Sequence, residues 1–422
     1  MPTGQRYSLR EQQTREKAYD KGLRGVERQA RKVSRFPAAR IGVQSRIIEL
    51  FAQFSAVALD LRPEAVKLIE NDFLPVGVSL AQWARRFDSS LSRADILQAC
   101  RNAWTACGLQ LLLGERTGLT PAILAYSLLY PYSDNYLDCT GLSNVAKSRF
   151  NERFRERLRG EEYAARDQRE TAIWALVTLI EGQYPRISYP QIFDCLLAIH
   201  RAQDESVAQQ RNFSRHDQVR LLQMSCAKGG ASVLADACLV RGQLSEEESK
   251  FSFEWGVLLQ FGDDLQDVRE DLLNGSMTLF SYVAASGKPL DGLVSQLLNF
   301  CEQVTIGMNN LTNGSELSKG LLRTSWRSLI IGSIADSCEY FSASFLAEVE
   351  QYSPFRFEFL RKRRKRLAAR QALYAALFDA FLESATESNA ELVMRLPAAS
   401  RIPRISNLAR RLPADGATFP DD

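Results

Sequence analysis

The sequence predicts an all-α protein. Apolar residues recur at spacings of three and four, as in Ile173, Val177 and Ile180, which is the period of an amphipathic helix. No run of alternating β-branched residues bounded by turn signals interrupts this pattern. None of the 14 prolines falls between Gln191 and Lys288, so the middle of the chain is able to form long helices. Together these observations favour helices over a mixed fold.

Capping residues place the ends of three expected helices. Thr120 followed by proline is typical of a helix start, and Gly141 suits its end, which predicts a helix of about 20 residues. The Ser-Glu-Glu-Glu run at 245–248 is a capping box, and the Asn-Gly pair at 274–275 ends the helix that it opens. At 1.5 Å per residue that helix would be roughly 40 Å long. A third helix is expected near residues 356–385.

Length and composition describe an ordinary globular chain. Its 422 residues are 45% hydrophobic and 24% charged, enough for one large core or two ordinary ones. The longest weakly polar run, residues 121–132, is shorter than the roughly 20 residues that cross a bilayer, and no signal peptide is expected at the start of the chain. The eight cysteines include no Cys-x-x-Cys pair, which favours reduced thiols. We therefore expect a cytoplasmic protein.

Charge divides the chain into four expected regions. Residues 1–40 carry 11 Lys and Arg against 4 Asp and Glu and should form a basic helical arm. A helical domain should follow over 41–350, then a basic C-terminal helix within 351–396 and a loosely ordered, proline-rich tail over 397–422. The six residues Arg361–Arg366 are all basic. Solvated helix faces are the favoured interpretation of both basic segments. The alternatives are contact with nucleic acid, with an anionic membrane surface or with a phosphorylated ligand, over which the run at 361–366 could close.

Histidine is too scarce for several kinds of enzyme. The chain has two histidines, whereas zinc enzymes and Ser-His-Asp hydrolases depend on His or on paired Cys. A bound metal ion should therefore be a hard cation held by carboxylates. Specific binding of nucleic acid is not expected, and an oligomer is compatible with the sequence.

Two acidic clusters are the most informative features of the sequence. The first is the run Tyr-Pro-Tyr-Ser-Asp-Asn-Tyr-Leu-Asp at 130–138, in which Asp134 and Asp138 lie four residues apart and share one helix face. The residues just before this run have the pattern of a buried core. Two like charges at the end of a buried helix repel each other, and a bound divalent cation is the simplest reason to keep both.

The second cluster holds five acids in nine residues. Asp263, Asp267 and Asp271 are spaced by four residues along one helix face. Asp264 and Glu270 lie beside this stripe, and a single arginine interrupts it. A solvated face remains the alternative for either cluster alone. Two clusters on separate helices favour several Mg²⁺ ions that hold a diphosphate between them.

These motifs resemble those of the class I isoprenoid synthases, the helical enzymes that ionise prenyl diphosphates. Residues 222–231, which contain Lys-Gly-Gly, and the Gln-x-x-Asp-Asp-x-x-Asp run at 260–267 are similar to the lysine element and second aspartate-rich motif of trans-prenyl diphosphate synthases. The Asp-x-x-x-Asp at 134–138 and the Asp-Val-Arg-Glu-Asp at 267–271 are similar to the two motifs of squalene and phytoene synthases. The order of elements over 134–280 resembles large bacterial terpene synthases of the tetraprenyl-curcumene type.

The resemblance covers about residues 120–350 and implies a single large helical bundle with a central active-site cavity. It implies a prenyl diphosphate substrate and Mg²⁺ as the cofactor, with several ions bridging the diphosphate. The implied metal ligands are Asp134, Asp138, Asp263, Asp264, Asp267 and Asp271. Of these, the expected catalytic residues are Asp134, Asp138, Asp263 and Asp267. The expected substrate-binding residues are Lys228, which would bind the diphosphate, and Gln260, Tyr130 and Trp255.

Departures from the family favour a terpene synthase that acts on one prenyl diphosphate. Chain-elongating synthases have a pair of arginines soon after the first motif and an earlier Gly-Lys-x-x-Arg stretch that holds isopentenyl diphosphate. Here Asp138 is followed by Cys-Thr-Gly-Leu-Ser-Asn-Val-Ala-Lys147, and residues 74–79 offer no such stretch. Lys147, Arg149 and Arg153 are candidates for displaced anchors.

Two other functions stay open on the sequence. One is a prenyltransferase, either chain-elongating or joining two diphosphates head to head, which requires a second diphosphate site. The other is not an enzyme but a helical scaffold whose basic arm binds RNA or membranes while its acids are solvated. The two aromatic residues assigned to the substrate likewise have an ordinary alternative, since aromatic side chains at helical spacing usually belong to a core.

Overall fold

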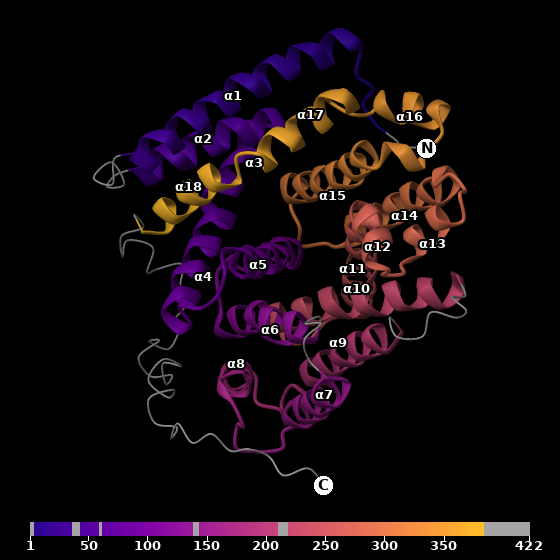
Figure 1. Ribbon diagram of the computed structural model, residues 1–422. Coiled ribbons are helices and arrows are strands. Elements are labelled where there is room, and N and C mark those ends of the chain that lie inside the picture. The colour runs from indigo at the N-terminus through magenta and orange to yellow at the C-terminus, as the bar shows by residue number, and fades with distance from the viewer. Residues whose placement is uncertain (1–3, 36–42, 59–60, 138–142, 210–217, 384–422) are drawn as a thin grey trace.

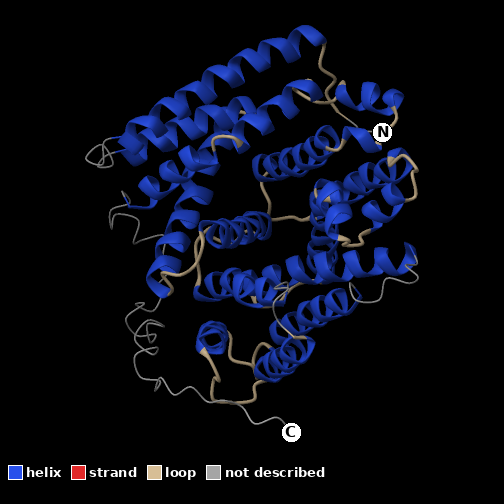
Figure 2. Cartoon of the chain, viewed as in Figure 1, coloured by secondary structure: helices blue, strands red, loops and turns tan. Residues whose placement is uncertain are grey.

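The computed structural model describes residues 4–35, 43–58, 61–137, 143–209 and 218–383. All regular secondary structure in these ranges is helical, which confirms the all-α prediction (Figure 2). No helix within them combines the length and apolarity that a membrane crossing needs.

The helices follow one another with short connections (Figure 1). In chain order they are α1 (Leu9–Arg35), α2 (Val43–Ala58), α3 (Pro63–Leu68), α4 (Leu74–Phe87), α5 (Arg93–Leu113), α6 (Pro121–Leu137), α7 (Asn144–Arg159), α8 (Gln168–Gln183), α9 (Pro190–Gln209), α10 (Gln218–Arg241), α11 (Glu246–Gln266), α12 (Val268–Asn274), α13 (Leu279–Ala285), α14 (Asp291–Asn310), α15 (Glu316–Asp336), α16 (Ala343–Glu350), α17 (Phe357–Ala368) and α18 (Gln371–Glu383). A π-helical turn, Ile69–Phe73, joins α3 to α4, and a 3-10 turn, Cys338–Tyr340, precedes α16.

Two apolar cores hold the bundle together. One is built mainly from α4, α5, α6, α8, α9 and α10, and the other from α11, α14, α15 and α16. Helices α5 and α10 supply residues to both cores. Helix α10 packs against α5, α6, α9 and α11, and α11 packs in turn against α14 and α15. The pair α10 and α11 is therefore the centre of the fold.

Glycines let α10 and α11 cross with their backbones in contact. A Cβ atom built on Gly256 would lie 2.1 Å from the carbonyl oxygen of Gly229, and one built on Gly229 would lie 2.5 Å from the carbonyl oxygen of Gly256. Real Cβ atoms do not approach backbone oxygens so closely, so any larger residue forces the helices apart. On the next residue, Gly230, a Cβ would meet the ring of Phe253 at 2.4 Å.

The capping signals are correct at helix starts, whereas two of the expected helices are interrupted. Thr120 Oγ1 accepts a hydrogen bond from the Ile123 amide at 3.2 Å, and Ser245 begins α11 with a complete capping box. The expected 40 Å helix is instead α11 and α12, because Asp267 leaves helical geometry at φ −94° and ψ 3°. The helix expected at 356–385 is likewise two helices, α17 and α18. Gly141 lies outside the described residues.

The basic arm and the basic C-terminal helix pair with each other. Helix α1 runs beside α2 along one edge of the molecule, next to α17 and α18 (Figure 1). Arg363 forms an ion pair with Asp20, and Arg366 and Arg370 form ion pairs with the buried Glu27. The rings of Tyr19, Phe355 and Phe359 pack below these pairs, beside Leu23. Acids of the arm thus neutralise part of the basic run inside the molecule. Residues 397–422, the expected tail, lie outside the described residues.

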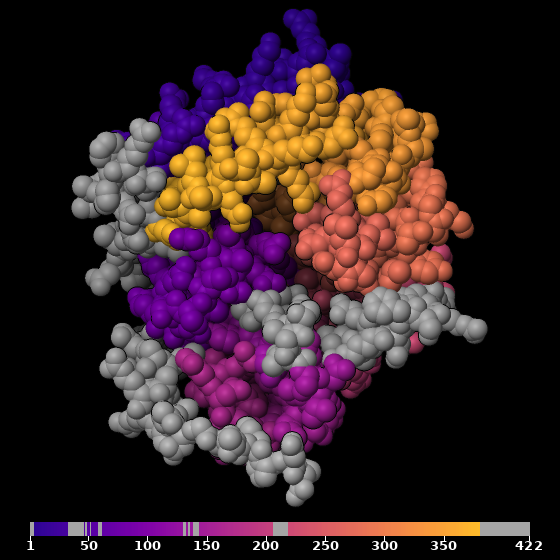
Figure 3. Space-filling view, viewed as in Figure 1, coloured from indigo at the N-terminus to yellow at the C-terminus, as the bar shows by residue number. Residues whose placement is uncertain are grey.

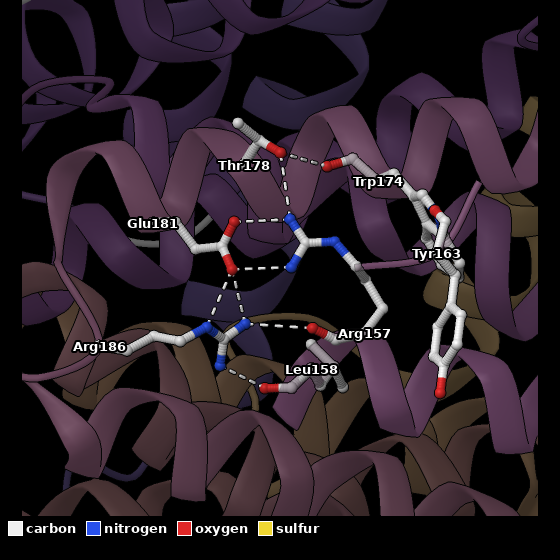
Figure 4. Close-up of polar contacts among 7 residues, drawn as sticks. All are labelled: Arg157, Leu158, Tyr163, Trp174, Thr178, Glu181 and Arg186. Atoms are coloured by element: carbon white, nitrogen blue, oxygen red, sulfur yellow. Dashed lines mark hydrogen bonds and ion pairs between the residues drawn. The ribbon is translucent and has the colours of Figure 1, made fainter. Parts of the chain in front are cut away.

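A half-buried ion cluster ties the end of α7 to α8. The guanidinium groups of Arg157 and Arg186 reach the Glu181 carboxylate from two sides (Figure 4). Arg157 donates to both carboxylate oxygens at 2.7 and 2.6 Å, and Arg186 donates to one of them at 2.7 Å. Burial would raise the pKa of Glu181, but these hydrogen bonds outweigh it and lower the pKa. These arginines are therefore committed to structure.

The seven cysteines of the described part of the chain carry free thiols. Cys100, Cys107, Cys238 and Cys301 are buried, in agreement with the expectation of reduced residues in apolar surroundings. Burial raises the pKa of Cys100 and of Cys301 to about 12, which keeps both thiols protonated and unreactive at neutral pH.

Candidate active site

The second acidic cluster lies where α11 ends and α12 begins. Asp264 is its buried member, with 6% of its surface exposed, and it accepts hydrogen bonds from Ser225 Oγ on α10 and from Gln260 Nε2, both at 2.7 Å. Burial raises the pKa of Asp264 despite these two donors. Asp264 thus joins α11 to α10, and Gln260 is occupied in orienting it.

The neighbouring Asp263 and Asp267 are exposed and Asp271 is half-buried, yet all three carboxyl groups have a raised pKa. Asp263 has an exposed side chain, but the surrounding protein raises its pKa to about 6 against the opposing charge of Arg101. Burial and the charge of Asp264 raise the pKa of Asp271 to about 7, and burial also raises the pKa of Asp267.

Lys228 approaches this cluster from α10. Its positive charge lowers the pKa of both Asp263 and Asp264, although burial of each acid is the larger effect. Lys228 immediately precedes Gly229, so it sits at the point where the two helix backbones touch. Ser225, one turn earlier on α10, holds Asp264 and so fixes the register of the two helices. Residues 222–231 and the second acidic cluster therefore lie on two helices that pack directly against each other.

Two arginines also act on these acids: Arg101, which the sequence interpretation did not select, and Arg364, which belongs to the basic run 361–366. Arg101, from α5, lowers the pKa of Asp263 and of Asp267 by its charge. Arg364, from the basic run on α17, forms an ion pair with Asp336, and its charge also lowers the pKa of Asp267. Arg101 had a signal in the sequence, because it is the one charged residue of α5 beyond the first turn.

The space-filling view shows a hollow in the same part of the molecule (Figure 3). It is bordered by α5, by the α12–α14 region, and by α17 and α18. These border elements include the ones that carry Arg101, Asp271 and Arg364. The acids at the end of α11 and the cations opposite them thus come from helices that surround one concave space.

The described residues alone do not complete a metal site. No three His, Cys, Asp or Glu side chains among them converge closely enough to hold an ion. Asp138 and the side chain of Asp134 lie outside the described residues, so the first cluster is not placed relative to the second. Burial and the charges of neighbouring acids make Asp263 and Asp271 hard to ionise. A hard cation such as Mg²⁺ would stabilise their ionised carboxylates.

The remaining expected site residues have other surroundings. Trp255 is 3% exposed and packs in the apolar core between Gly108 of α5 and Trp326 of α15. The side chain of Tyr130 lies outside the described residues. Among the displaced anchors, Arg153 donates two hydrogen bonds to Glu170, at 2.7 and 2.8 Å, and is occupied by that pair.

A buried acid that the sequence interpretation missed lies deeper in the bundle. Asp236, on α10, is fully buried, and burial raises its pKa well above the ordinary range against a hydrogen bond from Asn102. Asn102 Nδ2 lies 3.0 Å from Asp236 Oδ1 and 3.1 Å from Ser127 Oγ, so the group links α5, α6 and α10.

Comparison with known proteins leaves the site to be interpreted from its own geometry. No protein-family model, no curated protein and no solved structure matches this chain.

Proposed function

We propose that this chain is a Mg²⁺-dependent terpene synthase of the class I type. It would ionise a single prenyl diphosphate, release pyrophosphate and cyclise or rearrange the resulting carbocation. The observation that supports the proposal is the glycine crossing of α10 and α11, which packs the helix carrying Lys228 against the helix that carries Asp263 and Asp264. A cation on one helix and partly shielded carboxylates on the next suit a diphosphate bound through metal ions.

The chain's own residues would divide the work of binding and charge neutralisation. Asp263, Asp267 and Asp271, together with Asp134 and Asp138, would hold the Mg²⁺ ions, whose positive charge stabilises the departing diphosphate. Lys228 and Arg101 would contact phosphate oxygens directly. Asp264 acts differently, because its hydrogen bonds to Ser225 and Gln260 hold the two helices in register.

Water must be kept from the carbocation for the reaction to yield a terpene skeleton. Helix α11, which carries the acids, also contributes to the second apolar core, where Trp255 and Trp326 meet edge to face at 6.2 Å between ring centres. Aromatic faces also stabilise a nearby cation. These features support an apolar, water-excluding end to the cavity.

The test is pyrophosphate release from prenyl diphosphates of increasing length, with Mg²⁺ and with EDTA. We expect turnover to depend on Mg²⁺ and to fall at least 100-fold in Asp263→Ala and in Asp267→Ala, because each removes charge needed as the diphosphate leaves. The same loss is expected for Asp134→Ala and Asp138→Ala. Glu254→Gln, on α11 but far from the cluster, is the matched control and should keep full activity. Full activity in EDTA would refute the proposal.

A further inference from the structure

A second cavity lies on another side of α15, away from the acidic cluster. It has a volume of about 420 Å³ and is enclosed by the N-terminal segment, α3, α15 and the turn between α16 and α17. Three arginines line it: Arg62, Arg323 and Arg327. Tyr7, Tyr19, Tyr352 and Phe355 form an aromatic wall, and no carboxylate is among the described residues that line the space. We call this cavity the arginine pocket.

The charges of the arginine pocket are not balanced within the described part of the chain. Arg323 and Arg327 are four residues apart on α15, so their like charges share one face of the helix. Neither they nor Arg62 forms an ion pair with a described carboxylate, in contrast to Arg363 and Arg366 on neighbouring α17. The Nε atom of Arg323 is buried and has no described hydrogen-bond partner. A buried donor without a partner destabilises the fold, and an anionic ligand that accepts its hydrogen bond would remove that cost.

The N-terminal segment closes one side of this pocket. The backbone of Gly4 lies so close to the guanidinium of Arg327 that a Cβ atom there would be 2.4 Å from Arg327 Nη1. Gly4 also has φ +115°, a conformation that other residues rarely adopt. Behind it, Arg6 Nε donates to the hydroxyl of Tyr352 at 3.0 Å. Residues 4–8 thus cover the guanidinium of Arg327 without supplying a carboxylate as its counter-charge.

We propose that the arginine pocket binds a small molecule that carries a phosphate or diphosphate group. Planar guanidinium groups bind phosphate oxygens in pairs, and a volume of about 420 Å³ is in the range of ordinary ligand sites. The phosphate would lie against Arg62, Arg323 and Arg327, and the aromatic wall would contact an apolar substituent. The pocket shares no residue with the acidic cluster, so this proposal does not rest on the proposed function.

Isothermal titration calorimetry in EDTA tests the proposal on the full-length protein, because removing free metal abolishes any metal-bridged binding at the carboxylates. The probes are inorganic pyrophosphate and geranyl diphosphate. We expect both to bind, and to bind at least tenfold more weakly to Arg323→Met and to Arg62→Met. Arg62 is exposed and makes no side-chain capping bond, so its variant should fold even where Arg323→Met does not. Tighter binding of geranyl diphosphate than of pyrophosphate would assign the aromatic wall to the apolar tail.

Two control variants separate this pocket from other sites. Lys228→Met should leave the affinity unchanged, because Lys228 belongs to the acidic cluster. Arg116→Met removes the same charge from an exposed position outside the pocket and should also bind normally. Absence of binding to the wild-type protein, or equal weakening in Arg116→Met and Arg62→Met, would overturn the proposal. Binding that persists while prenyl diphosphate turnover is absent would refute only the proposed function.

Discussion

Replacing Gly256 by alanine tests the link between helix packing and the site. The added Cβ would lie 2.1 Å from the Gly229 oxygen and 3.0 Å from Val233 Cβ, so α10 and α11 must separate by about 1 Å to restore ordinary contact. Overpacking of this kind costs about 3 kcal/mol where backbone lies on both sides. Alanine's better helix propensity returns about 1 kcal/mol. We therefore expect Gly256→Ala to lower the free energy of unfolding by about 2 kcal/mol.

The same shift should impair the site more than it impairs the fold. Moving α10 by about 1 Å moves Lys228 away from Asp263, and a displacement of that size costs on the order of 100-fold in rate. The assays are the midpoint of urea unfolding, followed by circular dichroism at 222 nm, and pyrophosphate release by the folded variant.

A matched variant makes this prediction refutable. Gly320 lies within α15, and a Cβ there would meet nothing within 4 Å, so Gly320→Ala should gain up to about 1 kcal/mol of stability and keep full activity. If Gly256→Ala proves as stable and as active as Gly320→Ala, then the close crossing of α10 and α11 is not what positions the site.

Four further predictions concern the pH dependence of activation, the pH dependence of stability, the lysine and the number of substrates. The pKa is raised to about 6 for Asp263 and to about 7 for Asp271, so protons compete with Mg²⁺ for these carboxylates below pH 7. Activation of turnover by Mg²⁺ should therefore rise between pH 5 and pH 8, and a flat pH profile would contradict this. An unfolded carboxyl loses its proton near pH 4 while these two retain theirs, so the metal-free protein should lose stability as the pH rises from about 4 to 7, which unfolding midpoints can measure. Lys228→Met should raise KM and lower kcat, because a point charge on the phosphate acts in both ground and transition states; unchanged kinetics would assign Lys228 to structure alone. One prenyl diphosphate should suffice, giving a hydrocarbon or terpene alcohol, and label from isopentenyl diphosphate appearing in a longer prenyl diphosphate would favour the prenyltransferase instead.

A candidate site residue could be found from the sequence only where the pattern that marks it lies within a few neighbouring residues. Asp263, Asp264 and Asp267 became candidates because five acids in nine residues stand out within one stretch of the sequence. Their different roles were not recognisable, because only the neighbouring helix decides which carboxylate is buried against Ser225. Arg101 lies more than 150 residues before these acids, so its proximity depends on the packing of α5 and cannot be read from spacing.

The sequence by itself determined the helical class and most helix starts, because periodicity and capping act within a few residues. It did not determine the break at Asp267 or the division of the C-terminal helix into α17 and α18. Only the tertiary structure paired Arg366 with Glu27 across the chain and left the arginines of the second cavity without a described counter-charge. The physical reason is that folding brings distant segments of the chain into contact. Whether a charge is paired or a side chain is buried therefore depends on residues that lie hundreds of positions away in the sequence.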